Sequence, residues 1–502
     1  MAALLMGGQA VGELCKCSPT DACWPSDAEW EAFNATITGN LIRTVPPGSV
    51  CYPDEPNYDS EACDAVISGW SSSVFHSSDP ASVSTAWSNS SCVPVYPNGT
   101  SVDGVPGAGD RGCSLGALPS YVVNVTGPEE VQGALRFARE KNLRVVIKNT
   151  GHNGSGSTPY RLTTLRMVVG SLTRPGSIWT HNLKQTQFHE RFQPVSCSAN
   201  TTWKGSQMAI TIGAGIQDGE IFDFAKKNNV VAVGGTSKLH GLLPAIQEEG
   251  VKGYYTIGAP AGQTIALASS LFLWNAANGT AERVLAPVKA LLAANNGTVT
   301  GSVQTIPVPS FYDLLETMPI TESGARATTI TAARLITRRV VTEEQGLLAE
   351  VLEEVGTRVL APTNGLPNLS MSGTMTIGHE PVDNALNPAW RDSVVHLITQ
   401  QSWDGSLPAA NVSRIVNDMT YNKLNALRRL DPGSGTYLNE ANTFEPGWQW
   451  SFFGPNYGRL RSIKDKYDPE GLLWCPQCVG GEDWVQREDG RLCEAYKPFG
   501  AR

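Results

Sequence analysis

The stretch YVVNVTGPEEVQGALRFAREKNLRVVIKNTGHNGSGST, from Tyr121 to Thr158, decides the fold of this chain. Its hydrophobic periodicity predicts a strand over Tyr121–Val125, a helix over Pro128–Lys141 and a second strand over Arg144–Lys148. A strand, a helix and a strand within about thirty residues form an α/β unit. The loop that follows is built of small residues, which let backbone N–H groups approach a diphosphate because no Cβ blocks the way. The residues alone leave open whether this loop binds a diphosphate or is a polar surface turn.

His152 lies inside this loop, between Gly151 and Asn153. An imidazole can bind a metal or act as a base. Its ring nitrogens can also be alkylated, so a covalent bond to a cofactor is chemically feasible. The position alone does not choose between these roles and that of a solvated side chain.

The remainder of the chain predicts a fold of the α+β class. A strand over Ala209–Gly215, a helix over Gln217–Asn228 and a strand over Val230–Gly235 repeat the first pattern. Further on, Val251–Ile257 has the character of a strand, and Thr342–Val355 that of an amphipathic helix with a capping box at Thr342. Strands and helices that alternate over this length predict an antiparallel sheet covered by helices.

Composition excludes several classes of protein. The chain has 502 residues, of which 41% are hydrophobic and 17% charged, so it can bury a substantial core. Its formal net charge is -9, and its lysines and arginines are scattered, which disfavours a nucleic-acid surface. We find no uninterrupted apolar run of the ~18 residues that a membrane span requires. We therefore expect neither a nucleic acid nor a membrane as a partner.

The cysteines indicate an oxidising compartment. The chain has 11 cysteines, and a cluster of them in the first hundred residues favours disulfide bonds. The spacing Cys475-Pro-Gln-Cys478 is that of a redox motif, but no matching pair accompanies it, and one or two structural disulfides near the C-terminus are the expectation. Since the number is odd, one cysteine is left over. The N-terminal cluster comprises Cys15, Cys17, Cys23, Cys51, Cys63 and Cys92.

Sequons for N-glycosylation, like the cysteines, indicate a protein of the secretory pathway. Ten Asn-x-Ser/Thr triplets favour a glycosylated, secreted product, although such triplets also arise by chance. Met1–Cys15 lacks a basic start and a long apolar run, so it is a poor signal peptide. We expect that the start codon is misplaced; the alternative is a protein that stays inside the cell. The sequons begin at Asn34, Asn89, Asn98, Asn124, Asn153, Asn200, Asn278, Asn296, Asn368 and Asn411.

The motif IKNTGH at 147–152, followed by SIWTHNLK at 177–184, resembles the signature of fungal FAD-linked oxidases. These form the berberine-bridge-enzyme-like group of the superfamily of vanillyl-alcohol oxidase and p-cresol methylhydroxylase (PCMH). The segment 23–52 resembles the N-terminal cap of the same group, and 437–475 resembles its closing C-terminal segment. The resemblance therefore covers both ends of the chain and much of the middle.

The resemblance implies a set of site residues. His152 would attach covalently to the flavin methyl carbon of FAD. Tyr437 would lie near the isoalloxazine as the candidate catalytic base, with a packing role as the alternative. The other cofactor-binding residues would be Asn149, Thr150, Gly151, Asn153 and Gly156 in the pyrophosphate loop, Asn439 near the isoalloxazine, and Asn456 and Tyr457 in the C-terminal segment.

The resemblance also implies an architecture. A cysteine-rich cap at 1–114 would precede an incomplete PCMH-type FAD-binding domain at 115–238, a substrate domain at 239–430, and a segment at 431–502 that packs on the FAD domain.

The implied activity is that of an oxidase. A monomer would oxidise a small organic substrate, an alcohol or a secondary metabolite, by hydride transfer to FAD, with O2 as acceptor. The alternatives are a flavin-poor cyclase or binding scaffold of the same fold, and an inactive product of a faulty gene model.

The sequence departs from the family in two places. The segment YRLTTLRMVVGSLTR at 160–174 is inserted between the His152 loop and SIWTH. Only Thr236, Ser237 and Lys238 separate Gly235 from the segment that resembles the substrate domain. We therefore expect that the second half of the flavin domain is deleted after Gly235. Such a deletion would leave unpaired strand edges and weaken flavin binding. The insert is either an extra loop or translated intron sequence. A mispredicted gene model with a skipped exon would account for both departures together, and the alternative is a real, shortened paralogue.

Overall fold

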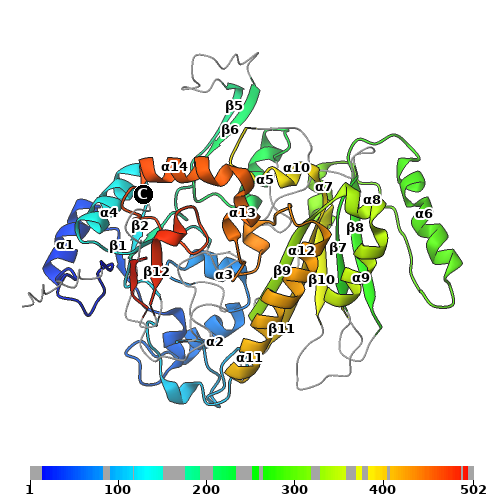
Figure 1. Cartoon of the computed structure of the whole chain (residues 1–502). Coiled ribbons are helices and arrows are strands. Elements are labelled where there is room, and N and C mark those ends of the chain that lie inside the picture. The colour runs from blue at the N-terminus through cyan, green and yellow to red at the C-terminus, as the bar shows by residue number, and fades with distance from the viewer. Residues whose placement is uncertain are drawn as a thin grey trace, which may run out of the picture. The chain divides into compact units, whose positions relative to one another are not determined.

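The computed structural model of the chain forms two compact units (Figure 1). The first consists of Met1–Trp70, Val74–Asn182 and Gly458–Arg502, and the second of Ser71–Ser73 and Leu183–Tyr457. The domain boundaries predicted at 114, 238 and 430 stay predictions. The structure describes residues 14–82, 91–116, 118–150, 176–192, 207–232, 251–258, 264–317, 328–357, 369–375, 383–403, 407–487 and 490–495.

The first unit contains the predicted strand–helix–strand element. Strands β2 (Tyr121–Asn124) and β3 (Val145–Lys148) flank helix α4 (Pro128–Glu140). Strand β4 (Gly176–Trp179) lies between β2 and β3 and is parallel to both, and β1 (Leu41–Arg43) adds an antiparallel edge, in the order β1-β2-β4-β3. Because β2, β4 and β3 are parallel, their carboxyl ends meet at one edge of the sheet.

Aromatic side chains join the N-terminal segment to this sheet. Helix α1 (Asp27–Thr36) begins with a capping box in which Ser26 and Glu29 bond each other's backbone N–H groups. Its Phe33 stacks on Phe137 of α4 at 4.2 Å between ring centroids, and Trp30 stacks on Tyr121 at 4.1 Å. Such pairs stabilise beyond the area that they bury. The remaining elements of this part of the chain are α2 (Ser60–Gly69), α3 (Ser73–Ser78), α14 (Tyr457–Tyr467), β12 (Trp484–Gln486) and β13 (Leu492–Glu494).

Five disulfides confirm the prediction that the N-terminal and C-terminal cysteines are paired. Cys475 bonds to Cys478, as expected for a structural disulfide near the C-terminus. The most distant pair is Cys15–Cys493, where the chain also forms the backbone bonds Lys16 N to Leu492 O and Glu494 N to Leu14 O, both 2.8 Å. The eleventh cysteine, Cys197, lies outside the described residues. The other pairs are Cys17–Cys23, Cys51–Cys63 and Cys92–Cys113.

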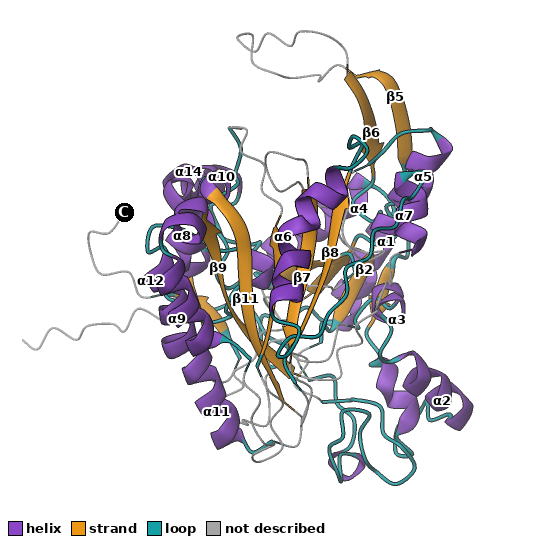
Figure 2. Cartoon of the chain, turned by 90° about the vertical axis from the view of Figure 1, so that its right-hand side faces the viewer, coloured by secondary structure: helices purple, strands orange, loops and turns teal. Residues whose placement is uncertain are grey.

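The second unit confirms the antiparallel sheet that the sequence predicted. Its five strands lie in the order β8-β7-β10-β11-β9, and each neighbouring pair is antiparallel. Helices α8, α9, α11 and α12 line one side of this sheet (Figure 2) and bury a shared apolar core against it. The strands are β7 (Val251–Gly258), β8 (Ala266–Leu273), β9 (Thr328–Thr337), β10 (Ser370–Met375) and β11 (Ser393–Trp403); the helices are α8 (Arg338–Glu343), α9 (Gln345–Val355), α11 (Ala409–Asn417) and α12 (Leu424–Leu430).

Two local predictions were wrong. The expected helix over Thr342–Val355 is split at Glu344, and Thr342 bonds back to the carbonyl of Arg338 instead of capping a helix. Val230–Ala232 forms no strand, because it pairs with no other strand among the residues that the structure describes. The remaining elements are β5 (Thr186–Phe192) and β6 (Gln207–Ile212), which form a hairpin, and helices α5 (Asp218–Lys227), α6 (Thr280–Ala294), α7 (Phe311–Thr317), α10 (Ala389–Asp392) and α13 (Trp448–Phe453).

The segment after α12 covers the β9 edge of this sheet. The backbone N–H of Leu335 donates to the carbonyl of Gly435 at 2.9 Å, and the Ser434 hydroxyl donates to the carbonyl of Leu335 at 2.8 Å. Asn442 donates to the carbonyl of Thr331 at 2.8 Å. A covered edge cannot pair with another chain. This pairing also fixes the path of residues 435–442 beside strand β9.

Candidate active site

The first group of predicted site residues begins at the carboxyl end of β3. Lys148 is the last residue of that strand, and Asn149 and Thr150, both half-buried, follow it. Among the described residues, the buried Oδ1 of Asn149 has no hydrogen-bond partner. Such an atom is available to a bound group. The other members of this group, Gly151, His152, Asn153 and Gly156, lie outside the described residues.

The second group is Tyr437 with Asn439, in the segment beside β9. The side-chain amide of Asn439 donates to the Tyr437 hydroxyl oxygen at 2.9 Å. The Tyr437 ring packs edge-on against Trp390, with 6.0 Å between centroids, and the residue is 37% exposed. The structure therefore brings these two predicted residues together and leaves the phenol accessible.

Sequence reasoning missed His396, which lies directly beneath Tyr437. His396 is on β11 and is 1% exposed. Its Nε2 lies 3.2 Å from the Thr436 hydroxyl and accepts the backbone N–H of Tyr437 at 3.5 Å. Its Nδ1 lies 3.1 Å from a carboxylate oxygen of Glu440. Nδ1 makes no hydrogen bond to the described residues, so Glu440 acts on the ring through its nearby negative charge.

Tyr254 belongs to the same face of the sheet. It pairs with Thr374 of β10, and Thr374 pairs with His396 of β11, so the three residues form one row across the strands. Burial, and next the negative charge of Glu440, raise the pKa of the Tyr254 hydroxyl. A histidine within the otherwise apolar run of residues 394–398 was the sequence signal for this cluster.

The side chains of Asn456 and Tyr457 contact other residues of the second unit. The side-chain amide of Asn456 donates to the carbonyl of Leu386 at 2.8 Å. The Tyr457 ring packs edge-on against Trp448 at 5.7 Å and is tilted against Phe453 at 5.8 Å. These contacts order the start of α14, and a contact of either residue with a cofactor remains a prediction.

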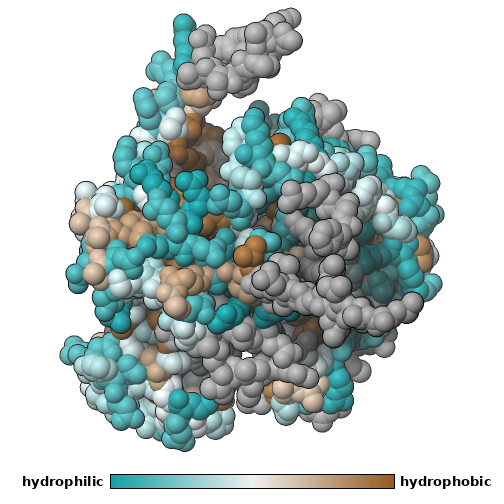
Figure 3. Space-filling view, turned by 60° about the vertical axis from the view of Figure 1, so that its left-hand side comes forward, coloured by the Kyte–Doolittle hydropathy of each residue, from teal (hydrophilic) through white to brown (hydrophobic). Residues whose placement is uncertain are grey.

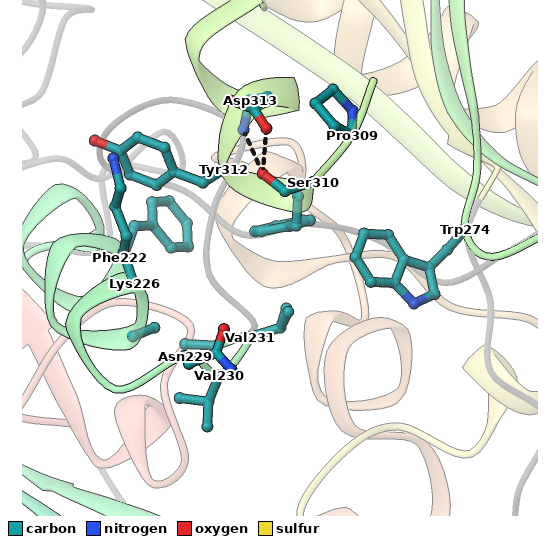
Figure 4. A pocket seen from close by; sticks show the side chains of 13 residues that line it. Phe222, Lys226, Asn229, Val230, Val231, Trp274, Pro309, Ser310, Tyr312 and Asp313 are labelled. Carbon is teal, nitrogen blue, oxygen red and sulfur yellow. Dashed lines mark hydrogen bonds between the residues drawn. The ribbon is translucent and has the colours of Figure 1, made fainter. Parts of the chain in front are cut away.

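A separate pocket of about 480 Å³ lies between α5 and the start of α7 (Figure 4). Phe222, Trp274 and Phe311 surround it with edge-on rings, and the ammonium of Lys226 lies 3.4 Å from the Tyr312 ring centroid. None of the predicted site residues lines this pocket, and we do not assign it to the active site.

In the part of the chain that the structure describes, no helix combines the length and apolar character that crossing a bilayer requires. Most described atoms on the face shown in Figure 3 are hydrophilic, and hydrophobic residues appear there in small groups.

Comparison with known proteins supports the resemblance. The family model described as Berberine and berberine like matches residues 436–480, the segment that holds Tyr437 and Asn439. The chain is 29% identical to the FAD-linked oxidoreductase sor8 of Hypocrea jecorina, over 95% of this chain and 93% of that protein. It is 27% identical to the VAO-type flavoprotein oxidase VAO615 of Thermothelomyces thermophilus, over 98% and 99%.

The fold is also that of a solved flavoprotein. The crystal structure of the VAO-type flavoprotein MtVAO615 from Myceliophthora thermophila C1 superposes with a TM-score of 0.75 and 25% identity, covering 96% of this chain and 100% of the other. The alignments with sor8 and VAO615 extend over 581 and 605 positions, more than the 502 residues of this chain. The two relatives therefore carry segments that this chain lacks. The matched segment, the relatives and the shared fold together show that this chain is similar to FAD-linked oxidoreductases and has the fold of a VAO-type flavoprotein.

Proposed function

We propose that this chain, as a monomer, oxidises a small alcohol or secondary metabolite, with covalently bound FAD as the hydride acceptor and O2 as the final electron acceptor. The observation that carries the proposal is the group of Tyr437, Asn439, His396 and Glu440, in which an accessible phenol lies beside the buried His396. When bound, FAD supplies the electrophilic N5 that takes a hydride.

The residues present fit FAD. The parallel strands β3 and β4 end together, and ligands bind outside the carboxyl ends of such strands. The unpaired buried oxygen of Asn149 lies at that edge and can accept a hydrogen bond from the cofactor. Thr150, Gly151, Asn153 and Gly156 would complete the pyrophosphate loop, and His152 would carry the covalent bond.

The described side chains can take the substrate proton. As two electrons leave the substrate carbon with its hydrogen, the hydroxyl proton would pass to Tyr437 in its phenolate form, which would become a neutral phenol. The side-chain amide of Asn439 donates to the Tyr437 oxygen at 2.9 Å and so holds that oxygen in place. His396 accepts the backbone N–H of Tyr437, and the Glu440 carboxylate lies 3.1 Å from the other ring nitrogen. Reoxidation by O2 would consume two electrons and two protons and release hydrogen peroxide.

Replacing His152 with alanine should abolish covalently bound flavin while soluble protein remains. The motive is the position of His152 in the IKNTGH motif. In-gel flavin fluorescence after denaturing electrophoresis measures the linkage. A matched control is His189→Ala, on the β5–β6 hairpin, which should leave the fluorescent band unchanged. A dark wild-type band contradicts a covalent linkage, and a fluorescent His152→Ala band places it elsewhere.

A second candidate is a flavin-poor product of a shortened flavin domain, since only three residues separate Gly235 from the segment that resembles the substrate domain. Absorbance of the purified protein before and after acid precipitation separates it from a loaded oxidase. Sequencing the transcript between the codons for Gly235 and Leu239 shows whether the gap belongs to the protein. If the short transcript is real and its product holds stoichiometric FAD, the deletion argument fails.

The secretory assignment predicts two gel shifts. Protein made in a eukaryotic secretory host, with a working signal peptide supplied, should gain mobility after treatment with an N-glycosidase, because ten sequons are available. It should also migrate differently with and without reductant, because Cys15–Cys493 closes nearly the whole chain. If neither shift occurs, the compartment assignment is wrong.

A further inference from the structure

Lys148 is a buried cation at the edge where the flavin loop begins. It is the last residue of β3 and is 2% exposed. Its ammonium donates to the carbonyl oxygens of His76 at 3.1 Å and Asp79 at 2.9 Å. It also lies 5.8 Å from the Trp179 ring centroid. The side chain therefore points away from solvent and into the N-terminal cap.

The two carbonyls belong to a turn that is itself held rigidly. His76 Nδ1 lies 2.6 Å from the Ser82 hydroxyl, and His76 Nε2 lies 2.8 Å from the carbonyl of Trp70. The Asp79 carboxylate accepts the backbone N–H groups of Ala81 at 2.9 Å and Ser82 at 2.6 Å. The segment from His76 to Ser82, which we call the cap turn, thus presents two fixed acceptors to the ammonium.

The backbone of Lys148 is fixed on the opposite side. Its carbonyl accepts the N–H of Thr180 at 2.8 Å, and it pairs with Trp179 in the parallel ladder. Asn149, with its unpaired oxygen, is the next residue. The Lys148 side chain therefore connects the cap turn to a backbone position that the sheet holds, directly before Asn149.

Stability alone does not account for this cation. Burial lowers the pKa of the Lys148 ammonium to about 8, against the opposing effect of Asp79, so the charged form is disfavoured there. An apolar side chain of the same length would fill the space without that desolvation. Such an apolar side chain has no donor for the two carbonyls, so it could not hold the cap turn at a fixed distance from the end of β3.

We propose that Lys148 is a positioning residue for flavin binding: its ammonium fastens the cap turn to the end of β3 and so fixes the start of the flavin loop. The inference rests on the proposed function, because it concerns how the chain holds its FAD. In this proposal Lys148 does not screen the negative charge of the FAD diphosphate, because its ammonium donates to two protein carbonyls.

The test compares Lys148→Met, Lys148→Arg and the surface control Lys141→Met, whose wild-type side chain pairs with Glu29. The readout is the molar ratio of flavin to protein in the folded, monodisperse fraction, with the melting temperature measured separately. We expect Lys148→Met to lower the ratio about tenfold, since two buried acceptors lose a charged donor. Lys148→Arg should recover part of it, and Lys141→Met should match the wild type.

A second variant covers the case in which Lys148→Met does not fold. Ser82→Ala removes the His76 partner and loosens the cap turn while Lys148 stays in place, so it should lower the flavin ratio by a smaller factor. Folded variants at Lys148 or Ser82 with the wild-type ratio overturn the inference. A wild type that binds no flavin overturns the proposed function instead, which keeps the two failures distinguishable.

Discussion

Replacing Tyr437 with phenylalanine should lower the turnover number by about 10²–10⁴-fold, the contribution of a positioned proton acceptor. The variant keeps the ring that packs against Trp390 and loses only the oxygen that Asn439 holds. The flavin ratio and the melting temperature should therefore stay close to those of the wild type. The rate of flavin bleaching under anaerobic mixing, with the best alcohol from a substrate panel, measures the effect on the reductive step.

The matched control is Tyr467→Phe, on α14, where the tyrosine is 76% exposed. It should leave the bleaching rate unchanged. His396→Gln should reduce the rate less than Tyr437→Phe, because His396 contacts the backbone of Tyr437 and not the phenol. If Tyr437→Phe bleaches at the wild-type rate, Tyr437 has only a packing role. Another group on this face of the sheet would then be the proton acceptor.

Replacing Glu445 with alanine should destabilise the second unit by about 3–5 kcal/mol, the usual effect of leaving a buried charge without its partner. The Glu445 side chain is fully buried, 2.7 Å from Arg428 and 3.7 Å from Arg334. Burial already lowers the pKa of Arg334 to about 10, and Glu445 opposes that shift. The measurement is the thermal midpoint and the denaturant midpoint of unfolding.

A surface pair supplies the comparison. Glu344 pairs with Arg339, and both side chains are more than a third exposed. Glu344→Ala should change the free energy of unfolding by no more than about 1 kcal/mol. Equal destabilisation by the two variants would show that the buried pair does not hold the segment after α12 to β9.

Local patterns were enough to predict β2, α4 and β3, because each depends on periodicity and turn residues within its own stretch. The cluster around His396 could not be predicted in this way. Tyr254 reaches His396 through the register of three strands, and Glu440 reaches it from a segment that covers the sheet edge. The family resemblance supplied Tyr437 and Asn439, but it did not supply the residues that hold them.

The pairing of the cysteines could not be predicted from the sequence, for a different reason. Eleven cysteines permit many pairings, and spacing along the chain does not select one. Cys475–Cys478 could be expected from its short spacing, whereas Cys15–Cys493 depends on the contact of the N-terminal segment with β13. The break at Glu344 shows the same limit for helices, since an apolar stripe does not reveal where the axis is interrupted.

The bond between Cys15 and Cys493 sets an order on biosynthesis. The two cysteines are separated by 478 residues, and at ~5–20 residues per second a ribosome needs about 25–95 seconds to travel that distance. During this interval Cys15 is a nascent thiol without its partner, two residues from Cys17 and close to Cys23. Completion of the first unit must therefore follow translation, and a disulfide isomerase has a defined error to correct: a premature Cys15–Cys23 or Cys15–Cys17 bond.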